Sequence, residues 1–188
     1  MRKVQPALVA FGSNQRFSGM KLPETLHAAA RKLAGPDLAV LAISRFYASP
    51  CFPVGAGPDY VNAAALLATS LDPAALLQRL HQVEADFGRV RVQRWGQRTL
   101  DLDLLACGDL VLPDAATHDH WRDLPPDRQG HLAPDQLILP HPRLQDRAFV
   151  LVPLADVAPD WRHPRLGLTV LEMLNRLELA EIAQVTPL

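Results

Sequence analysis

Hydrophobic and polar residues follow two different periods along this chain, and each period predicts one kind of secondary structure. Continuous or alternating apolar runs are typical of β-strands, and they occur over residues 7–11, 38–47, 60–69 and 99–106. Apolar residues spaced three and four apart are typical of amphipathic helices, and they occur over residues 22–33 and 73–87. In chain order the elements therefore run strand, helix, strand, strand, helix, strand.

Turn and cap residues set the ends of these elements. Gly12-Ser13-Asn14 fits a tight turn after the first strand, although the same residues can also cradle a ligand. Pro23 lies early in the first helix and Gly35-Pro36 ends it. Asp72-Pro73 supplies a cap and a first-turn proline for the second helix. These local signals agree with the periodicity.

This order of elements predicts an α+β fold with a ferredoxin-like βαββαβ core, in which an antiparallel sheet carries helices on one face. Gly108-Asp109 is expected to turn an added hairpin into residues 110–112. The polar, proline-bearing stretch 113–136 is expected to be a surface insertion or a set of short helices. Apolar patterns predict C-terminal helices over 147–158 and 169–179.

Length and charge are those of an ordinary soluble globular protein. The 188 residues, 48% of them hydrophobic, suit one domain spanning 1–188 with a sizeable core. A formal net charge of −1 argues against a general nucleic-acid or membrane-surface binder. The N-terminal apolar run is too short for a signal peptide, and no stretch reaches transmembrane length. We expect a cytoplasmic monomer that binds neither nucleic acid nor membranes.

Histidine and cysteine positions do not predict a transition-metal site. Cys51 and Cys107 lie far from any Cys-x-x-Cys pattern, so neither a zinc site nor a disulfide framework is indicated, and a reducing compartment fits. His118, His120 and His131 are scattered through the 113–136 stretch without compact ligand spacing, so we expect them to be solvated.

Charges that point to chemistry are concentrated in the segment 88–105. Asp101 and Asp103 are two residues apart, so both carboxylates point to the same face of a strand. A bound Mg²⁺ would relieve their repulsion, and guanidinium groups suit bidentate phosphate contacts. The arginines that precede the aspartates are Arg89, Arg91, Arg94 and Arg98. The pattern favours phosphoryl-type transfer, whereas the plainer alternative is a solvated edge strand that binds nothing.

Motifs along nearly the whole chain carry a family resemblance. They are Gly12-Ser13-Asn14, Pro-Asp-Tyr-Val-Asn-Ala-Ala at 58–64, Glu84 with Gly88-Arg89, Arg-Trp-Gly-Gln-Arg-Thr-Leu-Asp-Leu-Asp at 94–103, and Leu-Pro-His-Pro-Arg at 139–143. With these motifs the chain resembles the 6-hydroxymethyl-7,8-dihydropterin pyrophosphokinase family of the folate pathway. The resemblance implies a ferredoxin-like core and transfer of the β,γ-pyrophosphoryl group of ATP to the pterin hydroxymethyl oxygen, with release of AMP.

On the ATP side the resemblance implies metal, phosphate and nucleotide contacts. Asp101 and Asp103 match the family's Mg²⁺ ligands, which hold two ions that bridge the triphosphate. Arg89 and Arg98 match arginines that grip the phosphates and stabilise the transferring group. The other ATP contacts that the resemblance implies are Glu84, His141 and Arg147.

The implied pterin contacts are Ser49, Phe52, Tyr60, Asn62, Trp95 and Phe149. Tyr60 and Phe149 match aromatics that stack on the two faces of the flat heterocycle. Asn62 matches an amide that reads the ring edge, a role for which its mixed donor and acceptor groups are suited. Trp95 matches an aromatic of a lid loop that closes over the site and excludes water. The implied small-molecule partners are thus ATP and the pterin.

Three departures from the family pattern concern the lid and the surface. The arginine loop is one residue shorter than in the best-known members, with Val92 or Gln93 where a lysine can occur. Gln97 replaces the small residue or proline usual before the last arginine. The stretch 113–136 makes the chain about twenty residues longer here than the shortest members need, with no evident role.

Two alternatives to the pyrophosphokinase remain open at this point. One is a binding module for RNA or small ligands, but the aspartates beside the arginines would repel a nucleic-acid backbone. The other is a regulator that binds ATP or pterin without turnover, and the intact set of charged residues argues against it. Substitution of Asp101 distinguishes them, because it abolishes Mg²⁺-dependent turnover in an enzyme but leaves RNA binding intact in a module.

Overall fold

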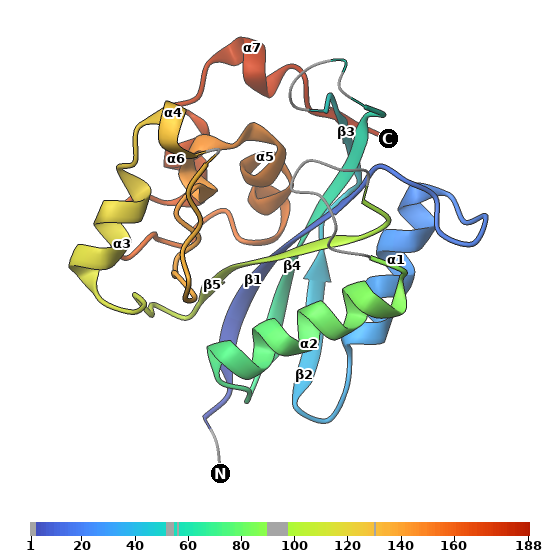
Figure 1. Cartoon of the computed structure of the whole chain (residues 1–188), viewed down its shortest axis with the longest axis horizontal. Helices are drawn as coiled ribbons and strands as arrows, with labels where there is room; N and C mark the ends of the chain where they lie inside the picture. The colour runs from blue at the N-terminus through green and yellow to red at the C-terminus, as the bar shows by residue number, and fades with distance from the viewer. Residues whose placement is uncertain (1–2, 52–54, 56, 90–97, 130) are drawn as a thin grey trace.

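The computed structural model describes residues 3–51, 55, 57–89, 98–129 and 131–188. Among these residues six strands form one antiparallel sheet, in the order β5-β1-β4-β3-β6, with β2 also paired to β4 (Figure 1). The strands are β1 (Gln5–Ser13), β2 (Leu38–Ile43), β3 (Tyr47–Ser49), β4 (Tyr60–Thr69), β5 (Asp101–Cys107) and β6 (Thr186–Pro187). A mixed fold with an antiparallel sheet was predicted, and this is confirmed.

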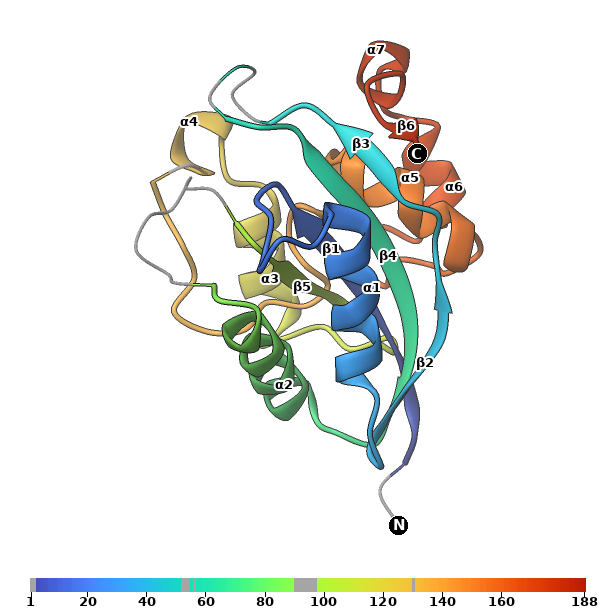
Figure 2. The ribbon, with the colours of Figure 1, turned by 90° about the vertical axis from the view of Figure 1, so that its right-hand side faces the viewer.

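Two helices cover one face of the sheet, α1 (Leu22–Leu33) and α2 (Pro73–Asp86) (Figure 2). Both have a proline in the first turn, and Asp72 Oδ1 accepts a hydrogen bond from the Ala75 N–H at 2.8 Å. Their apolar stripes pack on alternate residues of the sheet, including Val9 and Phe11 of β1 and Leu67 of β4. Both helices begin where the sequence predicted.

The opposite face is covered by the C-terminal helices α5 (Ala148–Val157) and α6 (Val170–Leu174) (Figure 2). Leu151 and Leu154 of α5 belong to a buried cluster with Leu8, Ala64 and Leu105 of the sheet. Alternation therefore gives each long strand two apolar faces, one for each helical layer. The two layers leave the sheet buried on both sides.

The sequence predicted one continuous strand over 38–47. This prediction is wrong because the chain forms two separate strands there, β2 and β3. Between them the Ser44 N–H donates to the Ala64 carbonyl oxygen at 2.9 Å, and Ser44 Oγ accepts from the Ala64 N–H at 2.9 Å. A side chain thus replaces a main-chain acceptor in the ladder, which periodicity does not reveal. The strand then resumes as β3 and reaches Ser49.

The predicted hairpin after β5 is also wrong. Gly108 forms a turn at φ +54°, but its N–H donates to the Pro6 carbonyl oxygen of β1 at 2.7 Å. Residues 110–112 leave the sheet because Leu112 instead exchanges two main-chain hydrogen bonds with Leu139, at 2.8 and 3.2 Å. The stretch between these two leucines therefore starts and ends at one point of the fold.

The final helix is shorter than predicted. It ends at Leu174 because Leu177 turns away to pack with Tyr47 and Val185, and a second short helix α7 (Leu179–Ile182) follows. The chain then forms β6, which pairs with β3. Figure 1 shows the C-terminus beside β3.

The 113–136 stretch contains two short helices, α3 (Ala115–Arg122) and α4 (Pro126–Gln129), and a 3₁₀ turn η1 (Leu144–Asp146) follows. His120 and His131 are exposed as expected, but His118 is fully buried. The expectation of solvation was wrong for His118 because its ring packs 5.7 Å from the ring of His163. In the part of the chain that the structure describes, no helix is long and apolar enough to cross a membrane.

Candidate active site

Three neighbouring strands bring Gly12, Asn62 and Asp101 into one row. Gly12 of β1 is paired with Asn62 of β4 on one side and with Asp101 of β5 on the other. Paired residues of antiparallel strands share a face, so the amide and the carboxylate flank the glycine on the same side of the sheet. A Cβ atom on Gly12 would lie 3.7 Å from Asn62 Oδ1 and 3.8 Å from Asp101 Cβ. The absent side chain leaves room between the two polar groups.

Asp103 lies on the same face one step further along β5. Its partner on β1 is Ala10, which is in turn paired with Ala64 of β4. The residues beside the two carboxylates are thus small, in contrast to the leucines that face α5 deeper in the sheet. Small side chains at this end of the sheet leave space for a bound ligand, where larger side chains would pack against the helices.

Asp101 is the electrostatic centre of this face. Arg89 pairs with Asp101 Oδ1 and Arg98 with Asp101 Oδ2, so each carboxylate oxygen has its own guanidinium. Burial, with the repulsion from Asp103, raises the pKa of Asp101, although the two arginines pull it down. Burial disfavours the charge on Arg98, but Asp101 outweighs this effect and the pKa of Arg98 is raised. Two guanidinium groups that share one carboxylate suit a polyanionic ligand, which can take the place of Asp101 as their partner.

The donor set at Asp101 and Asp103 fits magnesium better than a softer metal. No group of three or more His, Cys, Asp or Glu side chains that could hold a metal gathers among the described residues. Two carboxylates on one face would leave most coordination positions to water and phosphate, as Mg²⁺ prefers. The repulsion between Asp101 and Asp103 gives a physical reason for a cation between them.

Glu84 reaches Arg89 from the helical layer on the other face. It lies in α2 and is 1% exposed. Its Oε1 accepts a hydrogen bond from the Leu102 N–H at 2.7 Å and also pairs with Arg89. Glu84 thereby ties α2, β5 and Arg89 together, which makes it a support for the arginine in this structure.

Asn14 supports the second arginine, although the sequence indicated it only within the Gly12-Ser13-Asn14 segment and gave it no separate role. Its Oδ1 accepts from the Arg98 N–H at 2.8 Å, and its Nδ2 donates to the Pro58 carbonyl oxygen at 3.2 Å. The neighbouring Ser13 Oγ donates to the Thr99 carbonyl oxygen at 2.7 Å. The predicted tight turn at 12–14 is wrong, because Gly12 and Ser13 pair with β4 as the last residues of β1, and Ser13 and Asn14 instead anchor the start of β5. Three polar or small residues at the end of a buried strand were the signal that could have indicated this.

The residues expected to bind the pterin lie at the adjacent end of β3 and β4. Asn62 Nδ2 donates to Ser49 Oγ at 2.9 Å, and both residues are buried. Tyr60 is two residues from Asn62 on the same face, and burial raises its pKa. Phe149 is 39% exposed in the first turn of α5, the helix that covers this face. Phe52 and Trp95 lie outside the described residues.

His141 and Arg147 lie in the connection that leads into α5. The His141 N–H donates to the Leu105 carbonyl oxygen of β5 at 2.7 Å. Its Nδ1 accepts from the Arg143 N–H at 3.1 Å, which leaves Nε2 to carry the proton of a neutral ring. Burial, with the charges of Arg147 and Arg143, lowers the pKa of His141 to about 3. The Arg147 guanidinium lies 5.7 Å from the centre of the Phe149 ring.

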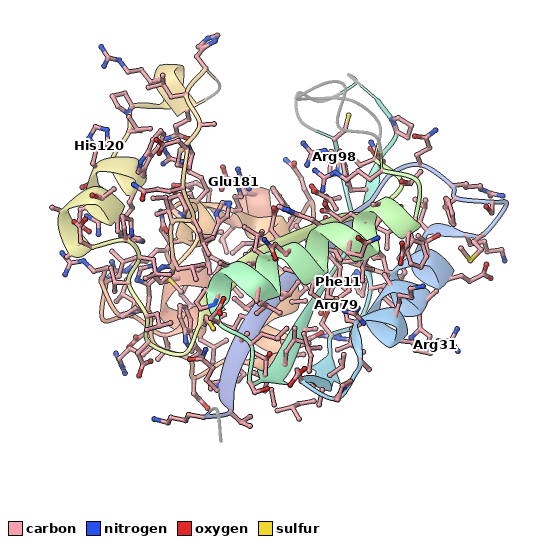
Figure 3. All side chains as sticks on the ribbon, turned by 60° about the horizontal axis from the view of Figure 1, so that its bottom comes forward. Phe11, Arg31, Arg79, Arg98, His120 and Glu181 are labelled. Atoms are coloured by element: carbon pink, nitrogen blue, oxygen red, sulfur yellow. The ribbon has the colours of Figure 1, made fainter. Side chains whose placement is uncertain are left out.

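The sheet therefore gathers most of the expected residues at one end. The register joins Asp101, Asp103 and Asn62, while Arg98 is labelled beside the loops at that end in Figure 3. Arg79 is labelled well apart from Arg98 in the same view. The site combines a paired-carboxylate face, two arginines and a buried amide, and this combination is suited to a phosphorylated ligand next to a hydrogen-bonding one.

Comparison with known proteins places this chain in a family of pyrophosphokinases. Residues 8–159 match the family model of 7,8-dihydro-6-hydroxymethylpterin-pyrophosphokinase (HPPK), and the chain belongs to this family. The resemblance found in the sequence is thus confirmed. Two curated relatives carry the name 2-amino-4-hydroxy-6-hydroxymethyldihydropteridine pyrophosphokinase. The protein from Synechocystis sp. is 41% identical over 130 residues, and that from Pseudomonas aeruginosa is 39% identical over 161 residues.

Coverage differs among the relatives. The match spans 69% of this chain and 56% of the Synechocystis protein, but 86% of this chain and 85% of the Pseudomonas protein. The solved structure of wild-type Plasmodium falciparum HPPK-DHPS matches 94% of this chain and 45% of its own length, with a TM-score of 0.62 and 14% identity. That likeness supports the fold.

Proposed function

We propose that this chain transfers the β,γ-pyrophosphoryl group of ATP to the hydroxymethyl oxygen of 6-hydroxymethyl-7,8-dihydropterin in folate biosynthesis. The hydroxymethyl oxygen bonds to the β-phosphorus, and the bond from that phosphorus to the α,β-bridging oxygen breaks. AMP leaves with the bridging oxygen, and the hydroxyl proton passes to water. The observation that carries the proposal is Asp101, which contacts both Arg89 and Arg98 and shares a row with Asn62.

The ATP half of the proposal uses the charges around Asp101. Mg²⁺, proposed as two ions held by Asp101 and Asp103 with phosphate oxygens, supplies charge neutralisation and alignment when bound. Arg89 and Arg98 bind the triphosphate and stabilise the transferring group, and in doing so they exchange Asp101 for phosphate oxygens. Arg89 stays oriented during this exchange because Glu84 holds it from α2. His141 and Arg147 bind the phosphates, and Glu84 belongs to this nucleotide side.

The pterin half uses the end of β3 and β4. Asn62 binds the donor and acceptor edge of the ring, and Ser49 fixes the orientation of that amide through the 2.9 Å hydrogen bond. Tyr60 and Phe149 stack on the two faces of the ring. Phe52 and Trp95 complete the set of proposed pterin contacts. Gly12 leaves the space through which the hydroxymethyl group reaches the phosphates, which its contacts with Asn62 and Asp101 support.

The proposal also covers the form in which the protein works. We propose a ferredoxin-like core, supported by the order β5-β1-β4-β2 with α1 and α2 on one face. We propose one domain over 1–188, with 113–136 as a surface insertion, acting as a cytoplasmic monomer without nucleic-acid or membrane partners. Both cysteines, Cys51 and Cys107, are buried, and no disulfide joins these two described residues, which supports a reducing compartment.

Release of AMP from ATP and Mg²⁺, measured with and without 6-hydroxymethyl-7,8-dihydropterin, tests the reaction. Asp103→Asn removes one carboxylate charge and should lower pterin-dependent AMP formation at least about a hundredfold. Asp109→Asn is the matched control, because Asp109 is exposed in the turn after β5 and should leave the rate unchanged. Substrate binding without AMP release by the native chain would contradict the enzyme and favour the regulator.

A further inference from the structure

The 113–136 stretch, which the proposed reaction does not use, touches the turn that carries His141. The stretch leaves the core at Leu112 and returns at Leu139, where the two residues exchange main-chain hydrogen bonds. Residues 139–143 follow at once and lead past His141 to η1. Any element that packs on this turn affects the nucleotide side of the site.

Helix α3 holds the turn before His141 through a buried histidine. His118 is 0% exposed, and its Nε2 donates to the Pro140 carbonyl oxygen at 3.1 Å. The buried Pro140 carbonyl oxygen therefore takes this hydrogen bond from a side chain of α3. The hydrogen bond fixes the peptide group directly ahead of His141.

The same helix holds the turn after His141 through an arginine. The Arg143 guanidinium donates to the Trp121 carbonyl oxygen at 2.9 Å and to the Arg122 carbonyl oxygen at 2.8 Å. These are carbonyls of the last turn of α3, which lack partners within the helix. The main-chain N–H of Arg143 meanwhile donates to His141 Nδ1 at 3.1 Å. One residue thus links the end of α3 to the imidazole.

A further contact fixes α3 to the rest of the protein. Asp119 pairs with Arg165, which lies in the connection between α5 and α6, and with Arg122 at 2.7 Å. The His118 ring also lies 5.7 Å from the ring of His163, and both rings are fully buried. α3 is therefore held by the C-terminal layer while it holds the turn, as a brace requires.

We propose that helix α3 of the 113–136 stretch is a brace for the nucleotide side of the site, and that His118 of α3 and Arg143 of the turn are positioning residues that set the place of His141. The inference rests on the proposed function, since it assigns the turn to nucleotide binding. If α3 positions His141 in this way, the stretch contributes to the affinity of the protein for ATP. A stretch that only adds surface would change stability and leave the ratio of the two substrate affinities unaltered.

Two pairs of variants test the brace in the full chain. His118→Phe keeps a ring of similar size but removes the donor to Pro140, whereas His118→Gln retains an N–H at a similar place. Arg143→Gln removes the contacts to α3. Arg79→Gln is its matched control, because Arg79 also donates to a last-turn carbonyl, that of Lys32 in α1, at 3.2 Å. Figure 3 labels Arg79 away from the Arg98 end of the sheet.

Binding is measured by calorimetry for α,β-methylene-ATP with Mg²⁺ and separately for the pterin. His118→Phe and Arg143→Gln should weaken nucleotide binding about tenfold and keep pterin affinity within about twofold, because a small misplacement of His141 is costly. His118→Gln and Arg79→Gln should resemble the wild type. Equal losses for both ligands in His118→Phe and Arg143→Gln, or no loss for either, would overturn the proposal.

Hydrogen exchange separates a failure of the brace from a failure of the proposed function. The His141 N–H bonds to the Leu105 carbonyl oxygen at 2.7 Å and the Leu144 N–H bonds to the His141 carbonyl oxygen at 3.0 Å. Both amides should exchange faster in His118→Phe than in His118→Gln. Unchanged exchange overturns the brace, while a wild-type chain that binds no nucleotide contradicts the proposed function itself.

Discussion

Asn14 and Arg98 hold each other through two hydrogen bonds in opposite directions. The Arg98 N–H donates to Asn14 Oδ1 at 2.8 Å, and the Asn14 N–H donates to the Arg98 carbonyl oxygen at 3.0 Å. Asn14 also reaches Pro58, so one 7% exposed side chain ties β1 to the residues before β5 and before β4. The position of an arginine proposed to bind phosphate thus depends on a neutral amide.

Asn14→Ala should lower the free energy of unfolding by about 1–3 kcal/mol, because the Arg98 N–H and the Pro58 carbonyl oxygen lose their hydrogen bonds to the Asn14 side chain. It should also lower kcat/KM for AMP formation, since Arg98 loses its anchor. Urea unfolding and the AMP assay measure the two effects. Asn175→Ala, at an exposed position after α6, should change stability by no more than about 0.5 kcal/mol. Wild-type activity in Asn14→Ala would contradict the anchoring role.

Gly12→Val should reduce activity far more than stability. A Cβ at Gly12 meets no atom closer than 3.7 Å, so the first added carbon fits without strain. The branched side chain would, however, occupy the space between Asn62 and Asp101. We expect kcat/KM to fall at least about tenfold. Thermal unfolding should shift by only a few degrees.

Gly12→Ala provides the graded step, with a smaller loss than Gly12→Val. Gly35→Ala is the matched control, since a Cβ there would lie 3.9 Å from Arg79 Nη2, away from the site. Equal activity of Gly12→Val and wild type would show that this space is not used by substrates.

Ser49→Ala should raise KM for the pterin and leave KM for ATP unchanged. The substitution removes the acceptor of the 2.9 Å hydrogen bond from Asn62 Nδ2, so the amide can rotate. Loss of a partner for a buried donor also costs about 1–3 kcal/mol of stability. Ser70→Ala is the control, because Ser70 makes an exposed hydrogen bond with Asp37 at 3.0 Å. A parallel rise in both KM values would argue against a role confined to the pterin.

Acid should destabilise the protein through His163. Burial, then the neighbouring His118 and Arg122, lower the pKa of His163 to about 4 from its ordinary value of 6.5. Between pH 4 and pH 6.5 the unfolded state therefore binds a proton at His163 more readily than the folded state does. The stabilisation is complete above pH 6.5 and is lost as the pH falls toward 4, by up to about 3 kcal/mol.

His163→Asn isolates this effect. His163 Nδ1 accepts from the N–H groups of Arg165 and Leu166 at 3.1 and 3.2 Å, and an asparagine oxygen can serve the same donors without titrating. Urea unfolding at several pH values should give a smaller loss of stability below pH 6.5 in the variant. Identical pH dependence in both proteins would exclude His163 as a source.

Local signals in the sequence were sufficient to predict where α1 and α2 begin and that the two aspartates of β5 lie on one face of that strand. Asp72 and the two first-turn prolines act within a few residues, and alternation fixes Asp101 and Asp103 on one side whatever the rest of the chain does. The family motifs contain Arg98 and Asn62, which the structure brings near Asp101, one by an ion pair and the other across Gly12, while their proposed roles stay predictions.

Features that depend on contacts between distant residues could not be predicted in this way. His118 is in a polar stretch, and only its packing against His163 explains its burial. Ser44 replaces a ladder group by a side-chain oxygen, which apolar periodicity does not register. Asn14 resembles an ordinary turn residue until the start of β5 is brought against it.

The pairing of β6 with β3 has a consequence for the order in which parts of the sheet fold during synthesis. Ala48 and Tyr47 of β3 pair with Thr186 and Pro187, which are synthesised after the other strands of the sheet. Ser49, which accepts the hydrogen bond from Asn62, is the last residue of β3. A ribosome-bound chain can therefore assemble β1, β4 and β5 before β6, the outer partner of β3, has been synthesised. Competence to bind the pterin should consequently lag behind collapse of the core during synthesis.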